Sequence, residues 1–116
     1  RLQLGVAYTR LGRLAEAVAT LRQVVAAAPG TAEAHASLGI ALAESRDPEA
    51  AAASYREAIR LRPDYANAHY NLGNACLQLQ RWKEAREAFA TALRLEPNFT
   101  AAREMLERMR AANLPD

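Results

Sequence analysis

Two histidines and one cysteine are the side chains of this 116-residue chain that could bind a metal ion or attack a substrate. Histidine and cysteine are common zinc ligands, and a cysteine becomes a nucleophile when an oriented base lies beside it. His35 and His69 occupy equivalent positions in a pattern that repeats along the chain, so we expect both rings to pack between helices. No oriented base accompanies Cys76, which we expect to be a buried, unreactive thiol. We therefore expect no metal site, no cofactor and no catalytic residue.

Four carboxamide side chains recur at steps of three to four between positions 67 and 78, which places them on one face of a helix. They are Asn67, Asn71, Asn74 and Gln78. Each carboxamide offers both a hydrogen-bond donor and an acceptor, as the backbone of an extended peptide does. One interpretation is a ladder that holds a peptide, and the other is a solvated polar helix face. Neutral Ala36, Ser37 and Ile40 on the matching face one repeat earlier favour the first, because solubility alone would select charged residues.

The elements that position these side chains follow from a repeat of about 34 residues, a length that is typical of stacked helix pairs. Pro29, Pro63 and Pro97 keep this step. Other positions that keep it are Leu4, Leu38 and Leu72; Gly5, Gly39 and Gly73; Ala17, Ala51 and Ala85; and Leu21, Tyr55 and Phe89. The pattern predicts helices near residues 1–11, 14–28, 32–45, 48–61, 66–79, 82–95 and 100–112.

This pattern resembles the tetratricopeptide repeat, which has preferred residues at positions 4, 7, 8, 11, 20, 24, 27 and 32. Between residues 66 and 99 these positions hold His69, Leu72, Gly73, Cys76, Ala85, Phe89, Ala92 and Pro97. The resemblance implies an all-α fold, an α-solenoid of three helix-turn-helix units and a capping helix, coiled as a right-handed superhelix. We place the units at residues 1–31, 32–65 and 66–99, and the capping helix at 100–112. The first unit starts at its own fourth position, so we expect a fragment of a longer protein.

The helix breaks and the internal glycines also have local causes. Asp47 and Pro48 form a typical N-cap and first helical position, and we expect Thr31 and Asp64 to cap the helices that follow them. A glycine inside a helix costs about 1 kcal/mol relative to alanine, which is tolerated where two backbones approach closely. We expect the repeated alanines to face the glycines, and larger side chains to fill the space between units. The alanines are Ala17, Ala51 and Ala85, and the larger side chains are Leu21, Tyr55 and Phe89.

The resemblance also implies a binding surface, because first helices line the concave side of such arrays. Its usual groove positions are 2, 5, 6, 9 and 13 of each unit. The third unit supplies Asn67, Tyr70, Asn71, Asn74 and Gln78; the second supplies Glu33, Ala36, Ser37, Ile40 and Glu44; the first supplies Leu2, Gln3, Val6 and Arg10; and the capping helix supplies Ala101, Glu104, Met105 and Arg108.

Two subclasses of the family can be compared at these positions. One binds C-terminal carboxylates through basic residues and asparagines, but this chain has no lysine or arginine at the corresponding positions. These hold Leu2, Val6, Ser37, Asn67 and Asn71. The stretch from His69 to Asn74 is more similar to repeats of O-linked N-acetylglucosamine transferases and their bacterial relatives, whose groove asparagines hold peptide backbones. That likeness concerns one repeat and does not make this chain a transferase.

Composition narrows the partners. The net charge is only +2 and no basic run is present, whereas nucleic-acid binding needs a clustered basic stripe. No apolar run approaches the roughly 18 residues of a membrane span, so we expect neither nucleic acid nor membrane insertion, and a cytoplasmic location unless a signal was lost with a missing segment. The predicted function is a scaffold that holds an extended or helical segment of a protein or peptide. The alternatives are a non-catalytic targeting or regulatory part of a larger enzyme, such as a glycosyltransferase, and self-association through the apolar face of the first unit.

Overall fold

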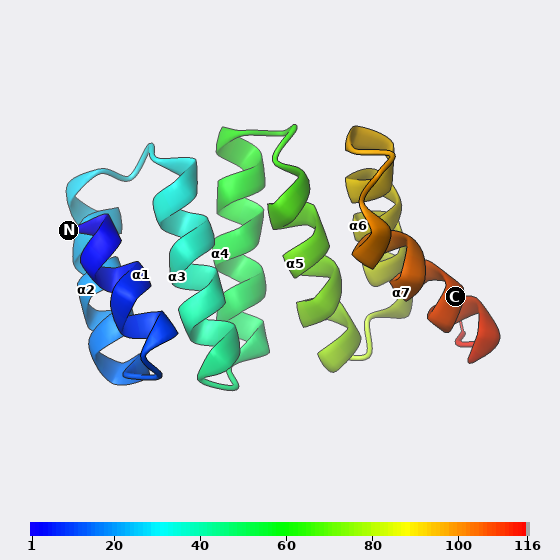
Figure 1. The fold of residues 1–116 in the computed structure, drawn as a ribbon, viewed down its shortest axis with the longest axis horizontal. Helices are drawn as coiled ribbons and strands as arrows, with labels where there is room; N and C mark the ends of the chain where they lie inside the picture. Colours follow the sequence, from blue (N-terminus) through cyan, green and yellow to red (C-terminus); the bar gives the residue numbers. More distant parts are fainter. Residues whose placement is uncertain (116) are drawn as a thin grey trace.

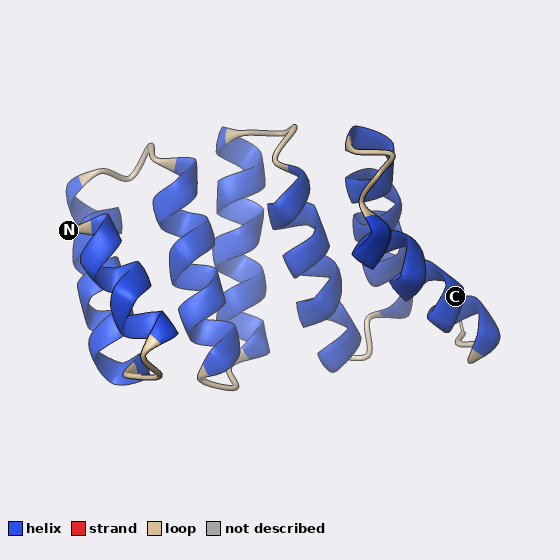
Figure 2. Ribbon diagram, in the orientation of Figure 1, coloured by secondary structure: helices blue, strands red, loops and turns tan. Residues whose placement is uncertain are grey.

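Residues 1–115, which the computed structural model describes, form helices joined by short loops (Figures 1 and 2). Over these residues there are seven helices and no strand. They are α1 (Leu2–Arg10), α2 (Leu14–Ala27), α3 (Ala32–Glu44), α4 (Pro48–Leu61), α5 (Ala66–Gln78), α6 (Trp82–Leu95) and α7 (Thr100–Ala111). Every predicted helix is confirmed, with each end within one residue of the prediction. Within the described part of the chain, no helix combines the length and the apolar character that crossing a bilayer requires.

The helices form two layers along an elongated array of 41 × 25 × 21 Å. Each of α1, α3 and α5 packs against the helix that follows it, and α7 packs against α6 (Figure 1). In addition, α1 contacts α3 and α3 contacts α5, whereas the second helices of successive pairs make no comparable contacts. The first helices therefore lie closer together than the second helices, which makes them the inner layer of the array.

Close packing inside each pair depends on a glycine in the first helix and a large side chain in the second. A Cβ atom added to Gly39 would lie 2.5 Å from Cε1 of Tyr55, a distance at which the ring would have to move. The three such pairs are Gly5 with Leu21, Gly39 with Tyr55, and Gly73 with Phe89. The large side chains that we expect between units therefore also pack against the glycines within each pair. The alanines are fully buried in the same core, but the large side chains occupy the space that a Cβ would need.

A side chain in the first turn of the next helix closes each junction between pairs. Nε2 of His35 lies 2.8 Å from the carbonyl oxygen of Pro29, and Nε2 of His69 lies 2.9 Å from that of Pro63. Because a carbonyl oxygen can only accept a hydrogen bond, Nε2 of each ring is protonated and donates the hydrogen bond. At the third junction, the guanidinium of Arg103 reaches the Pro97 carbonyl at 3.4 Å. The histidines pack as predicted, and they also hold the proline turns in place.

The helix caps agree with the sequence in part. The carboxylate of Asp47 accepts a hydrogen bond from the Ala50 amide at 3.2 Å, so this predicted cap is confirmed. Thr31 stands at the N-cap of α3, but its side chain makes no capping hydrogen bond. The predicted cap at Asp64 is wrong, because Tyr65 occupies the N-cap of α5. A backbone hydrogen bond from Tyr65 N to Arg62 O closes a turn that contains Asp64, which leaves its carboxylate one residue too early.

The turns inside the pairs share a left-handed residue. Gly12, Arg46 and Gln80 have φ angles of 77°, 65° and 60° and are spaced by the repeat length. Only the first is a glycine, the residue that adopts this conformation without steric cost. The other two turns therefore carry backbone strain that the first avoids.

Candidate functional site

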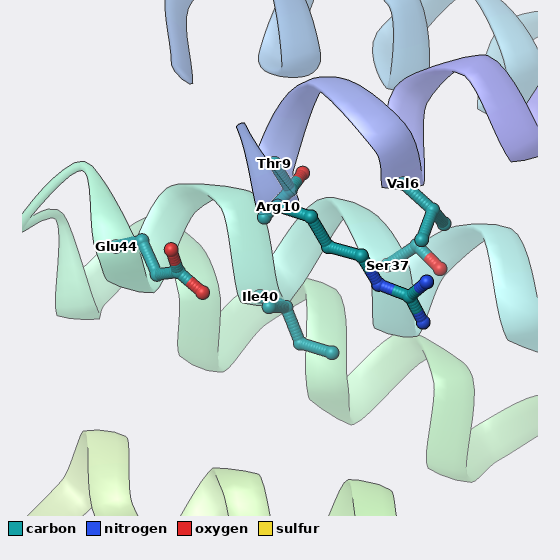
Figure 3. A pocket seen from close by; sticks show the side chains of 6 residues that line it. All are labelled: Val6, Thr9, Arg10, Ser37, Ile40 and Glu44. Carbon is teal, nitrogen blue, oxygen red and sulfur yellow. The ribbon is translucent and has the colours of Figure 1, made fainter. Parts of the chain in front are cut away.

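The inner layer is hollowed where α1 and α3 lie side by side. Two hollows, of about 430 and 630 Å³, adjoin here and share Val6, Arg10 and Ser37. We call the combined surface the α1–α3 groove. It is lined by Leu2, Gln3, Val6, Ala7, Thr9, Arg10, Leu11, Glu33, Ser37, Ile40, Glu44 and Tyr65. Figure 3 shows the smaller hollow, with side chains from both helices around it.

Apolar side chains provide much of this lining and remain open to solvent. Leu11 is 70% exposed and Ile40 is 37% exposed, although both are large hydrophobic residues. Val6 and Leu2 are half-buried beside them. Large apolar side chains that gather on one surface are a common mark of a contact surface, whereas single ones scattered over a protein are not. The groove can therefore gain free energy by covering these side chains with a partner.

The charges around the groove differ in whether they are already paired. Glu33 lies 3.7 Å from the guanidinium of Arg62, which in turn lies over the Tyr65 ring at 4.6 Å from its centre. Partial burial raises the pKa of Tyr65, so this phenol stays neutral. Arg10 and Glu44 line the smaller hollow, and across residues 1–115 neither has an ion-pair partner.

The structure gathers the groove residues predicted for the first two units and separates those of the third. Eight of the nine residues predicted for the first two units line the groove: Leu2, Gln3, Val6, Arg10, Glu33, Ser37, Ile40 and Glu44. The ninth, Ala36, is buried in the core and does not line it. Of the four carboxamides on α5, Asn67 and Gln78 are exposed, and Asn71 and Asn74 are half-buried. None of these four is among the lining residues of the α1–α3 groove.

Two other predicted residues have different surroundings. The ring of Tyr70 is half-buried and lies 5.6 Å from that of Phe89 and 5.0 Å from that of Phe99, measured between ring centres. These distances are typical of aromatic packing, so much of this ring is engaged inside the array. Arg108 is exposed in the last turn of α7.

Sequence reasoning missed several lining residues because they fall outside the positions that the repeat pattern marks. Leu11 follows the last residue of α1, and Tyr65 precedes α5. The sequence shows a leucine at the end of the first predicted helix, but only the fold shows that this Leu11 side chain is exposed and borders a hollow. Thr9 lines the groove as well, although its hydroxyl donates to the Gly5 carbonyl at 3.0 Å.

The reactive residue types lie elsewhere. Cys76 is fully buried, and burial raises the pKa of its thiol to about 11, which keeps it protonated. Over the described residues, no group of three or more histidine, cysteine, aspartate or glutamate side chains could hold a metal ion. The groove itself offers carboxamide, hydroxyl, guanidinium and carboxylate groups beside apolar ones. These groups suit non-covalent recognition.

Comparison with known proteins identifies the family. The family model described as "Tetratricopeptide repeat" matches residues 2–63 and residues 36–98. The chain therefore belongs to the tetratricopeptide repeat family. No curated protein sequence matches it significantly.

Solved structures share the fold. The crystal structure of MamA has a TM-score of 0.91 at 28% identity, covering 97% of this chain and 67% of that chain. The second tetratricopeptide domain of human RPAP3, in complex with the HSP70 peptide SGPTIEEVD, has a TM-score of 0.89 at 26% identity, covering 93% and 90%. The translocator chaperone SycD of Yersinia enterocolitica has a TM-score of 0.92 over 97% of this chain and 82% of that chain. At 16% identity, SycD shows the fold alone.

Proposed function

We propose that this chain is a non-catalytic scaffold module that binds a segment of another protein in the α1–α3 groove. The observation that carries the proposal is the lining of this groove, which includes the exposed Leu11 and Ile40. It also includes Arg10 and Glu44, which have no ion-pair partner over residues 1–115. Apolar side chains supply the gain on burial, and the polar groups supply orientation. A short peptide of this kind should bind with a Kd on the order of micromolar, or about −8 kcal/mol.

A related structure supports a peptide as the ligand but does not support recognition of its C-terminal carboxylate. The RPAP3 domain holds a peptide that ends in EEVD. In this chain, the positions that a carboxylate-binding subclass fills with basic residues hold Leu2, Val6, Ser37, Asn67 and Asn71. None of these carries a positive charge. We therefore propose that this chain binds an internal segment and does not clamp a free C-terminal carboxylate.

The carboxamide face of α5 extends this proposal. Asn71 and Asn74 are half-buried on α5, which contacts α3 in the inner layer. Their donors and acceptors suit the backbone of a segment that continues beyond the groove. This is also the feature on which the resemblance to the repeats of O-linked N-acetylglucosamine transferases rests. It supports a targeting role within a larger protein.

A panel of random dodecapeptides displayed on phage would test this function. Peptides selected on the chain should be resynthesised, and their affinities measured for the parent, for Ile40→Asp in the groove and for Ala53→Asp on α4. Both variants add one carboxylate at an exposed helical position. We expect at least a tenfold loss for the first variant, since it places a charge against an apolar side chain, and none for the second. Equal binding to all three proteins would refute the groove as the binding surface.

Self-association is a second candidate, favoured by the apolar side chains that α1 leaves open. Leu4 is 41% exposed, and a hollow of about 360 Å³ between α1 and α2 is lined in part by Leu2, Val24 and Ala27. Sedimentation over a hundredfold range of concentration should then show a mass that rises in the parent and stays at the monomer value in Leu4→Glu. A monomer at every concentration of the parent would exclude this candidate.

A further inference from the structure

We infer that the α1–α3 groove selects a partner segment with an ordered charge pattern, and this inference rests on the function proposed above. The segment carries an acidic side chain opposite Arg10, an apolar side chain against Val6 and Ile40, and a basic side chain opposite Glu44. All four groove residues line the same hollow. In Figure 3, the side chain of Ile40 lies between the carboxylate of Glu44 and the guanidinium of Arg10.

Several other charged side chains of the chain form ion pairs with one another. Arg13 binds Glu16 at 2.7 Å, Arg56 binds Glu84 at 2.6 Å, and Arg81 binds Glu49 at 3.0 Å. The remaining acid of the groove, Glu33, already faces Arg62. Over residues 1–115, Arg10 and Glu44 lack such a partner although they line one hollow.

The cost of removing water from Arg10 and Glu44 determines which partners the groove can bind. A partner that covers Val6 and Ile40 also removes water from the neighbouring guanidinium and carboxylate. A charge that loses its water is costly unless an opposite charge replaces that water. A segment with both charges meets this requirement at both sites when it runs in one direction along the groove, whereas the same segment in the opposite direction places like charges together. Charge complementarity of this kind sets specificity and orientation more than total affinity.

The packing of α1 against α3 determines the order in which the basic, apolar and acidic side chains lie along the groove. Ile40 and Glu44 are separated by one helical turn on α3, so they lie one above the other on the same face. Arg10 is the last residue of α1 and reaches the hollow from the neighbouring helix. The positive and negative groups therefore stand on opposite sides of an apolar centre and come from different elements of one packed layer. A segment can satisfy both only in one direction.

A charge-swap experiment tests this inference. The random dodecapeptides should be selected separately on the parent and on the double variant Arg10→Glu/Glu44→Arg. The control is Glu57→Arg/Arg60→Glu, which reverses an ion-paired couple on the second helix α4. We expect parent and control to select the same charge order, and the groove swap to select the reverse order. Peptides selected on the parent should bind the groove swap at least about tenfold more weakly.

The outcomes separate the inference from the proposed function. Peptides that lose binding to Ile40→Asp but show no preferred charge order, or bind the groove swap unchanged, would overturn the charge pattern and leave the groove as the binding surface. Peptides that bind Ile40→Asp as well as the parent would overturn both. Replacing the acidic residue of a selected peptide with glutamine should cost about fivefold in affinity for the parent and nothing for Arg10→Gln. An equal loss for both proteins would refute the contact with Arg10.

Discussion

Replacing Gly39 with alanine should destabilise the array, although alanine is the better helix former. Gly39 lies inside α3 and faces the ring of Tyr55 from α4. A Cβ at this position would lie 2.5 Å from Cε1, 2.8 Å from Cδ1 and 3.0 Å from Cζ of that ring. The ring is only 2% exposed, so it has little room to move away.

Two opposing effects determine the size of the change. Alanine in place of glycine gains about 1 kcal/mol of helix propensity. Forcing extra volume into a packed core costs about 1 to 3 kcal/mol, and the upper value applies because three ring atoms are too close at once. The net loss should be about 2 kcal/mol. For a chain of this length, that corresponds to a fall in Tm of about 8 °C.

Urea unfolding followed by circular dichroism would measure this loss, with Gly30→Ala as the matched control. No atom lies within 4 Å of the Cβ position at Gly30, so that variant should be neutral or slightly more stable. When Tyr55→Ala has removed the ring, Gly39→Ala should stabilise by about 1 kcal/mol, which gives a coupling of about 3 kcal/mol. A Gly39→Ala protein as stable as the parent would refute the close-packing explanation of the repeated glycines.

Three further predictions concern a cap, a turn and the thiol. Asp47→Ala should cost about 1 kcal/mol in urea unfolding, because the Ala50 amide loses its capping carboxylate; an unchanged midpoint would contradict the cap. Arg46→Gly should stabilise by up to about 1 kcal/mol, because it relieves the positive φ angle of this turn residue, and a loss of stability would contradict the strain. The Cys76 thiol should react with a disulfide reagent at pH 8 at least about 100-fold more slowly in the folded chain than in urea, since burial raises its pKa to about 11. Equal reactivity in the folded and unfolded states would refute burial of the thiol. The free energy of unfolding should also fall as the pH rises from about 9 to about 11, because the unfolded chain releases the thiol proton at a lower pH than the folded chain.

The sequence predicted the helices well because the repeat presents the same local signals several times. Pro29, Pro63 and Pro97 each follow the end of a helix, and a short turn then leads to the next one, so the helix ends could be located to within one residue. Asp47 was found as a cap because its carboxylate precedes a proline, a purely local signal. Asp64 was misassigned because α5 starts at Ala66, so the N-cap position falls on Tyr65, one residue after Asp64.

Features that depend on packing were harder to predict. The repeat shows that Gly39 and Tyr55 are each needed, but only the three-dimensional structure shows that they contact each other. The hydrogen bond from His35 to the Pro29 carbonyl could not be predicted from the sequence either, because a side chain in the following helix can reach a turn in several ways. Several lining residues of the groove stand at positions that the repeat pattern marks, whereas Leu11 does not, because it lies beyond the end of α1.

Nuclear magnetic resonance during a peptide titration would show directly whether the α1–α3 groove is the binding surface. Backbone amide spectra of the isotope-labelled chain should be recorded as a peptide selected from the dodecapeptide library is added. We expect the largest shifts in α1 and α3, around Val6 and Ile40, and little change for amides on the outer faces of α2, α4 and α6. Largest shifts in the second helices, with α1 and α3 unchanged, would contradict the assignment of the α1–α3 groove as the binding surface.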